Sequence, residues 1–332
     1  MKNNPRLYVL LISLLSVTAG CGGGRNEKKQ EPVPQAVAAP VIDNETLLLL
    51  KDLEENGDYV NSQFFPSLIK ASVVREEMGK NNLVIDLRQP ELFSRGHIKG
   101  AVNKQFKDLP EYFETGIKPF EYNRIIIVCD DGQVSSYTTS LLRLMGYGNV
   151  FSLRWGMSGW NTEYAREGWL KGVSGKFESG LQVTSNDPPV AERMPELRTN
   201  LTTGKEIGEA RFRKLFDEGT GNILITAGEV FENPDKFFII NFERKDKYDD
   251  GHIPGAVRFK PESTLGFTDV MATIPIDRTI VVYCGSGHNS GFATAYLRLF
   301  GYDARTLKYG NNGFMYDKMV AQKAALSWLP FT

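Results

Sequence analysis

The sequence is short of cysteine, of net charge and of apolar runs long enough to span a membrane, and each shortage excludes a class of protein. Three cysteines in 332 residues are too few for a disulfide-stapled scaffold. The formal net charge of −1 offers no basic surface for a polyelectrolyte, so we expect no nucleic-acid partner. The apolar stretch 7–20 is too short for a comfortable membrane span.

That stretch has instead the form of an export signal. Lys2 and Arg6 make a positively charged start, and the apolar run ends in Thr18-Ala19-Gly20-Cys21. The ending resembles the bacterial lipobox, which implies that Cys21 is lipidated after removal of a signal peptide, 1–20. The alternative is an ordinary cleaved signal with an incidental cysteine. Either way we expect the protein to be exported.

Residues 21–62 follow, and their first part is rich in glycine, proline, alanine and charge. Such a composition cannot build a core, so we interpret 21–62 as a flexible tether that holds the body of the protein off the membrane. The residue after the cysteine, Gly22, is not an acidic residue of the kind that would retain a lipoprotein in the inner membrane. We therefore expect a lipid anchor in the bacterial cell membrane, in the outer membrane and facing the periplasm.

The remainder of the chain repeats itself. Cys129 and Cys284 lie 155 positions apart, and the same spacing relates His97 to His252, Asp86 to Asn241, and Gly132 to Gly287. Self-similarity at one fixed spacing indicates a tandem duplication. We divide the chain accordingly into a first domain, 63–172, a linker, 173–204, and a second domain, 205–332.

Each copy alternates short apolar runs with helical patterns, which is typical of a mostly parallel α/β sheet covered by helices on both faces. A further amphipathic helix, 205–219, opens the second half or bridges the two halves. In the first copy the expected elements are helices at 67–79 and 135–146 and strands at 83–87, 124–129 and 149–153.

Three short patterns in the chain resemble the rhodanese (sulfurtransferase) family. They are D-x-R at 86–88, GHIxGA in both copies, and a strand ending in C-x-x-G-x-x-S before a helix, again in both copies. The resemblance covers most of the chain after the tether. It implies two tandem rhodanese-like α/β domains, each with one cysteine loop. It also implies a double displacement in which Cys284 takes the sulfane sulfur of thiosulfate, polysulfide or a persulfide and passes it to a thiol or another thiophile.

The residues after Cys284 suit that chemistry. A glycine-rich loop at a helix start exposes backbone N–H groups that bind anions and lower the pKa of a cysteine, so we expect a reactive thiolate. Ser290 is expected as an N-cap-like residue. The alternative is that Cys284 is a small buried hydrophobe. The expected binding residues are Gly285, Ser286, Gly287, His288, Asn289 and Ser290.

The second copy departs from the family in its arginines. Asn289 stands where the family usually has arginine, and Glu243 stands where the first copy has Arg88. Arg244 lies one place further on, so we count Arg88 and Arg244 as candidate substrate-binding residues. A lost guanidinium removes a clamp for an oxyanion, which favours a less charged donor. A protonated His288 could replace part of that charge.

The first copy is less suited to anion chemistry. Asp130 and Asp131 follow Cys129 directly, and two carboxylates should raise the pKa of that thiol and repel an anionic donor. Cys129 is therefore the second and weaker catalytic candidate, or an inert residue of a packing domain. A disulfide between Cys129 and Cys284 is not expected, because two separate pockets would have to face each other.

We expect no metal and no cofactor, since His97 and His252 have no second ligand at helical spacing. A ring bonded to nearby backbone or to Asp86 is the better interpretation of these histidines. Four aromatic residues could line a pocket mouth or serve in packing: Trp155, Trp160, Tyr309 and Phe314.

Two functions remain open at this point. One is a lipid-anchored sulfurtransferase that uses small sulfur-containing anions and thiol acceptors. The other is a non-catalytic module that carries sulfur or selenium, or binds a partner, in an envelope redox complex. The missing loop arginines favour the second, and the retained cysteines and glycines favour the first.

Overall fold

A computed structural model describes residues 39–261 and 264–329. The predicted signal peptide, Cys21 and the first part of the predicted tether lie outside these residues. Within them, no helix is long and apolar enough to cross a membrane.

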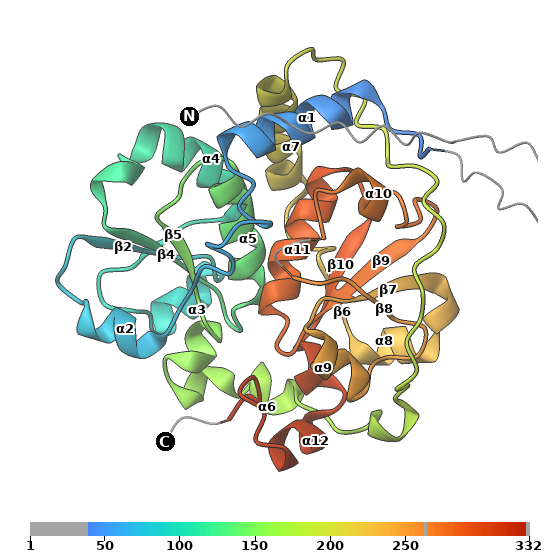
Figure 1. Ribbon diagram of the computed structural model, residues 1–332. Helices are drawn as coiled ribbons and strands as arrows, with labels where there is room; N and C mark the ends of the chain where they lie inside the picture. The colour runs from blue at the N-terminus through green and yellow to red at the C-terminus, as the bar shows by residue number, and fades with distance from the viewer. Residues whose placement is uncertain (1–38, 262–263, 330–332) are drawn as a thin grey trace, which may run out of the picture. The chain divides into compact units, whose positions relative to one another are not determined.

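The described chain forms two five-stranded parallel sheets of the same topology, which appear side by side in Figure 1. The first has the order β1-β5-β4-β2-β3 and the second the order β6-β10-β9-β7-β8. The strands of the first sheet are β1 (Leu68–Ile69), β2 (Asn82–Asp86), β3 (Val102–Asn103), β4 (Arg124–Val128) and β5 (Val150–Leu153). Those of the second are β6 (Leu224–Ile225), β7 (Phe237–Asn241), β8 (Val257–Arg258), β9 (Thr279–Tyr283) and β10 (Ala304–Leu307).

The two sheets also share one register. Ile85 of β2 pairs with Ile127 of β4, and the repeat partners Ile240 and Val282 pair in the same way in the second sheet. These central strands are buried along nearly their whole length, as continuous apolar runs between two helical layers require. The expectation of two tandem α/β domains is confirmed.

Helices cover both faces of each sheet. In the first domain they are α2 (Ala71–Glu76), α3 (Pro90–Arg95), α4 (Leu109–Glu111), α5 (Gln133–Leu144) and α6 (Trp169–Gly172). In the second they are α8 (Ala227–Glu232), α9 (Lys245–Asp249), α10 (Thr268–Met271), α11 (His288–Leu299) and α12 (Tyr316–Ala321).

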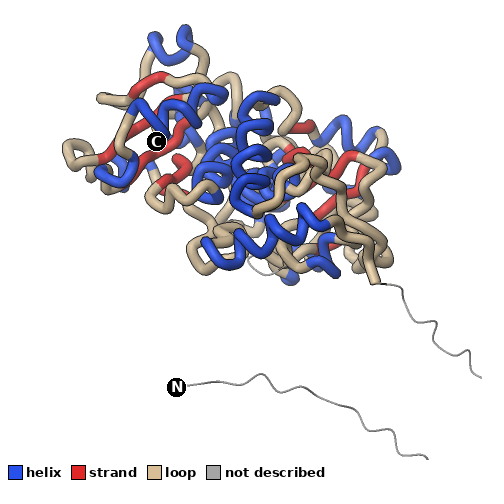
Figure 2. Tube along the Cα trace, turned by 90° about the horizontal axis from the view of Figure 1, so that it is seen from above, coloured by secondary structure: helices blue, strands red, loops and turns tan. Residues whose placement is uncertain are grey.

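The helices that follow the two cysteines, α5 and α11, pack directly against each other between the sheets (Figures 1 and 2). Ser140 of α5 donates a hydrogen bond to the backbone oxygen of Phe292 in α11 at 3.0 Å. A Cβ atom at Gly291 would lie 3.1 Å from the backbone oxygen of Gln133, so glycine permits this close approach. Because both helices are buried almost all round, the two domains share one hydrophobic core.

The structure differs from the expected tether at α1 (Asn44–Asn56), which lies inside 21–62. The Asp43 carboxylate caps this helix by accepting from the N–H groups of Glu45 and Thr46 at 2.9 and 3.1 Å. Its buried residues Leu49 and Leu53 join the common core. Residues 44–56 are therefore part of the folded body, because they bury an apolar face.

The predicted helix at 205–219 is confirmed as α7 (Gly204–Glu218), which packs on α1 and bridges the two domains. Arg213 pairs with Glu114 of the first domain at 3.0 Å, and the Arg211 guanidinium donates to the backbone oxygen of Leu299 in the second at 2.9 Å. The linker before it includes a short 3-10 helix, Glu178–Gly180, and is held to the second domain where Gln182 and His252 bond through their backbones.

Candidate active site

Each domain carries its cysteine from the central strand onto a loop that opens the shared central helices. Cys284 follows β9 and precedes α11, and Cys129 follows β4 and precedes α5. Both loops pass through a glycine in the left-handed region, Gly287 at φ 79° and Gly132 at φ 90°. Only glycine adopts that conformation without strain. The predicted strand, cysteine loop and helix are therefore present in both copies.

Backbone N–H groups point at both sulfur atoms. Cys129 Sγ accepts from Gly132 at 3.1 Å and from Ser135 at 3.3 Å, and Cys284 Sγ accepts from Ser290 at 3.4 Å. The expected N-cap role of Ser290 is wrong, because Gly287 occupies the cap position of α11. Ser290 lies inside the first turn, with its hydroxyl 3.5 Å from Cys284 Sγ.

The expectation of a lowered cysteine pKa is also wrong. Burial raises the pKa of the Cys284 thiol, and the neighbouring Glu243 carboxyl raises it further. Cys284 is only 2% exposed, so the loss of hydration outweighs its hydrogen bonds to the helix N-terminus. Burial and then Asp131 raise the pKa of Cys129 to about 12, in the direction predicted from its carboxylates.

His288 does not supply positive charge to the Cys284 loop. Its ring is fully buried and turned toward the first domain, where Nε2 accepts the N–H of Trp155 at 3.0 Å. Nδ1 lies 2.8 Å from the Ser286 hydroxyl. Burial, and then the charge of Arg154, lower the pKa of His288 to about 3. His288 therefore has a structural role at the domain interface, whereas the Ser286 backbone hydrogen-bonds the Cys284 thiol.

Gln133 repeats this contact from the other side. It is the repeat partner of His288, and its Oε1 accepts the N–H of Tyr309 at 2.7 Å. Trp155 and Tyr309 adopt φ values of 68° and 66°, which are unusual for residues other than glycine. Each loop therefore contributes one side chain that accepts a hydrogen bond from the backbone of the other domain. Both cysteines, Cys129 and Cys284, are free thiols.

The two candidate arginines lie in different domains, and each is paired with an acidic side chain. Arg88 belongs to the first domain, where it is buried and bonds both oxygens of Asp86, with Nη2 2.8 Å from Oδ2. Arg244 is exposed and paired with Asp246 at 2.6 Å. It stands at the rim of a pocket that opens beside Cys284.

That pocket has a volume of about 490 Å³, which suits a small organic ligand. Cys284 and Gly285 lie in it, and so does Asn289, where the family usually has arginine. Apolar walls come from Met315, Met319 and Leu326, and the polar lining includes Glu243 and Asn311.

Glu243 and Asn311 were not predicted as site residues. The repeat could have indicated both, since Glu243 aligns with Arg88 and, after a one-residue slip that shortens the spacing to 154, Asn311 aligns with Met157. At both positions the chemical type of the side chain differs between the two copies: arginine is replaced by glutamate, and methionine by asparagine. The geometry alone brings these two residues together at Cys284.

The two histidines bond nearby backbone, as expected. His97 and His252 bond the backbone oxygens of Phe93 and Tyr248, at 2.9 and 2.8 Å. Of the four aromatic residues, Trp155 and Tyr309 join a buried cluster between the domains, Phe314 lies in the outer core of the second domain, and Trp160 stacks under Arg75.

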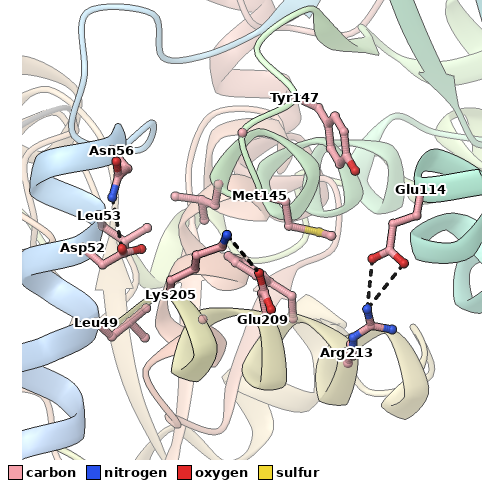
Figure 3. A pocket seen from close by; sticks show the side chains of 14 residues that line it. Leu49, Asp52, Leu53, Asn56, Glu114, Met145, Tyr147, Lys205, Glu209 and Arg213 are labelled. Atoms are coloured by element: carbon pink, nitrogen blue, oxygen red, sulfur yellow. Dashed lines mark hydrogen bonds and ion pairs between the residues drawn. The ribbon is translucent and has the colours of Figure 1, made fainter. Parts of the chain in front are cut away.

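A second pocket, of about 450 Å³, lies between α1, α7 and the end of α5 (Figure 3). Its polar side chains are largely paired with one another, as Lys205 is with Glu209 and Arg213 with Glu114. It contains neither cysteine. We therefore place the candidate chemistry at Cys284 and not in this pocket.

The fold and the loops define a protein of two α/β domains, each presenting a thiol at the start of a central helix. The family model described as "Rhodanese-like domain" matches residues 70–163 and again 227–317, together more than half of the chain. The chain belongs to the rhodanese-like domain family.

Several known proteins share part of this sequence. The chain is 32% identical over 66 residues to thiosulfate sulfurtransferase PspE of Escherichia coli (strain K12), covering 20% of this chain and 62% of that protein. It is 27% identical over 121 residues to a tRNA uridine(34) hydroxylase of Prochlorococcus marinus, covering 34% of this chain and 36% of that protein. The match thus covers about a third of the length of each of these hydroxylases.

Among solved structures, a thiosulfate sulfurtransferase from Pseudomonas aeruginosa aligns with 81% of this chain and 47% of its own, at 15% identity and a TM-score of 0.29.

Proposed function

We propose that the protein is a sulfurtransferase in which Cys284 carries the transferred sulfur. The observation that carries this proposal is the position of Cys284, whose sulfur accepts an N–H at the start of α11 while the residue borders a pocket large enough for a donor. Membership of the rhodanese-like family supports it.

The proposed reaction is a double displacement. Cys284 attacks the sulfane sulfur of a donor, the donor's remaining fragment leaves, and Cys284 holds a persulfide. A thiol or another thiophile then attacks the outer sulfur and restores the thiol. The Ser290 N–H at 3.4 Å stabilises negative charge on the cysteine sulfur. Neither half-reaction changes the oxidation level of the transferred sulfur.

Cys129 is the weaker candidate. Burial and Asp131 hold the pKa of its thiol at about 12, so that almost none is ionised at neutral pH. We propose that the first domain serves chiefly to support the loop of the second, through Gln133 and Trp155.

A non-catalytic module that carries sulfur or selenium, or binds an envelope redox partner, is the second candidate. The raised pKa of Cys284 favours it, because a buried neutral thiol is a slow nucleophile. The two candidates differ in whether a donor loads sulfur onto Cys284 and an acceptor removes it.

Intact mass of residues 22–332 before and after thiosulfate or polysulfide tests the proposal, with Cys284→Ser and Cys129→Ser alongside. A gain of one sulfur that cyanide or dithiothreitol reverses, and that only Cys284→Ser abolishes, is the expected result. If no donor adds sulfur to either cysteine, the binding module replaces the enzyme.

We also propose that the protein is exported and anchored through a lipid on Cys21, in the outer membrane facing the periplasm. The support is the sequence alone: a charged start, an apolar run and a lipobox-like ending. Metabolic labelling with a radioactive fatty acid, compared between the full chain and Cys21→Ala, tests it. Equal labelling of the two chains would refute the anchor.

A further inference from the structure

The pocket beside Cys284 contains a buried carboxyl group that the double displacement leaves without a role. Glu243 is 8% exposed and stands where the first domain has Arg88. Its Oε2 accepts from Asn311 Nδ2 at 2.8 Å. A Cβ atom at Gly285 would lie 3.2 Å from Glu243 Oε1, so the carboxyl group lies against the residue that follows Cys284.

Asn311 adds a second unused polar atom. It is 5% exposed, its backbone N–H donates to the backbone oxygen of Cys284 at 2.9 Å, and its Nδ2 is committed to Glu243. Its Oδ1 has no hydrogen-bond partner among the described residues. A buried acceptor left unpaired is destabilising, so this atom indicates a ligand that brings a hydrogen-bond donor.

Among the residues that the structure describes, no cation forms an ion pair with Glu243, and the charge of Lys247 only partly offsets its burial. Burial raises the pKa of its carboxyl to about 7, against the hydrogen bonds from Asn311 and the Gly285 backbone. Arg244 is paired with Asp246, and Arg258 bonds only the backbone oxygen of Glu243. The other titratable groups that act on Glu243, or on which it acts, are Lys247, Tyr283 and Cys284.

We propose that Glu243 makes Cys284 a site for organic persulfides, R–S–SH, and carries the proton between the Cys284 thiol and the thiolate that leaves. This inference rests on the proposed function and specifies its donor. Asn311 Oδ1 accepts the hydrogen of the incoming S–H group. At the rim, the exposed Lys247 and Lys323 suit a donor whose organic part bears carboxylates.

The step balances without an oxidant or a reductant. The Glu243 carboxylate takes the proton of the Cys284 thiol, and the thiolate attacks the outer sulfur of R–S–SH. A bond forms between Cys284 Sγ and that sulfur, while the S–S bond of the donor breaks. The electron pair leaves on R–S⁻, which takes the proton from Glu243 and departs as R–SH. The sulfane sulfur keeps its oxidation level, now as Cys284–S–SH.

Thiosulfate suits this site poorly. It carries two negative charges and leaves sulfite, which calls for a cationic clamp of the kind that a guanidinium provides. An ionised Glu243 repels such a donor instead. A thiolate leaving group, by contrast, has a pKa near 8.5 in its thiol form and benefits from a nearby acid of similar strength.

The test measures the rate of sulfur loading on Cys284 by intact mass in the full chain carrying Cys21→Ser and Cys129→Ser, from pH 5 to 9. The donors are glutathione persulfide and, separately, thiosulfate. Glu243→Gln should slow loading from glutathione persulfide on the order of 10²-fold and remove an inflection near pH 7. Glu243→Arg should raise the rate from thiosulfate relative to the persulfide. Asp249→Asn, an exposed carboxyl on α9, is the matched control and should change neither.

A second measurement needs no variant at Glu243. The ratio of Cys284 alkylation by anionic iodoacetate to that by neutral iodoacetamide should fall as pH rises through 7, because the carboxyl group becomes charged. A constant ratio, or unchanged loading and pH profile in Glu243→Gln, overturns the role of Glu243. Faster loading of the parent chain from thiosulfate than from glutathione persulfide overturns the donor class. Failure of every donor to load Cys284 overturns the proposed function, and this inference with it.

Discussion

The hydrogen bond between His288 and the Trp155 backbone predicts how the free energy of unfolding depends on pH. His288 is fully buried and its folded pKa is about 3, against an ordinary value of 6.5. Below pH 6.5 the unfolded chain takes up a proton at His288 that the folded chain does not. The stability held by neutral His288 is therefore complete above pH 6.5 and is lost as pH falls toward 3.

The magnitude follows from the two pKa values. Between pH 7.5 and pH 5 the free energy of unfolding should drop by about 2 kcal/mol on account of this one ring. Glu243 works in the opposite direction over the same range, because its folded pKa is raised. The contribution of His288 must therefore be isolated by comparing two chains.

His288→Gln provides that comparison. Gln133 makes the equivalent hydrogen bond to Tyr309 in the repeat, so a glutamine at 288 can accept the Trp155 N–H without titrating. Urea unfolding of both chains at pH 7.5 and pH 5 measures the effect. The difference in unfolding free energy between them should shift by about 2 kcal/mol in favour of the variant at pH 5. Parallel pH profiles would refute the assignment of His288 as a buried neutral acceptor.

Three further predictions concern the loops. His288→Ala should lower the free energy of unfolding in urea by about 1–3 kcal/mol or more, because the Trp155 N–H then has no acceptor. A loss as small as that of a surface substitution would contradict this hydrogen bond. Gly287→Ala should lower the free energy of unfolding by about 1–2 kcal/mol or more, since φ is 79° and the added Cβ would lie 2.5 Å from Gln133 Oε1. Gly221→Ala, at a glycine with open space around it, is the control, and equal losses in the two variants would contradict this prediction. Alkylation of Cys129 by iodoacetamide should still accelerate between pH 9 and 11, because its pKa is about 12, and a plateau below pH 9 would contradict the burial.

The fold was largely predictable because the repeat makes every element appear twice. The helix at 135–146 and the strands at 83–87 and 124–129 are found within a few residues as α5, β2 and β4. The helix at 67–79 was only partly right, since Leu68 and Ile69 pair with β5 as an edge strand before α2 begins. Two residues are too short a run for any periodicity to reveal.

The site was predictable only where the chemistry is local. Cys284, Gly285 and Asn289 follow one another in sequence and do line one pocket. His288 belongs to the same run, yet its ring serves the other domain. The His288 ring accepts the N–H of Trp155 in the first domain, 133 positions earlier in the chain, so no local pattern could indicate this contact.

The sequence by itself determined the duplication, the α/β class of each copy and the delivery of a cysteine onto a glycine turn, because these depend on short-range periodicity and on conformations open only to glycine. Only the tertiary structure determined the burial of each thiol and the groups around it. Folding of the whole chain buries both cysteines, which raises the pKa of each thiol, and brings Glu243 and Asn311 to the wall of one pocket. Desolvation depends on every atom around a group, and those atoms come together only when the whole chain has folded.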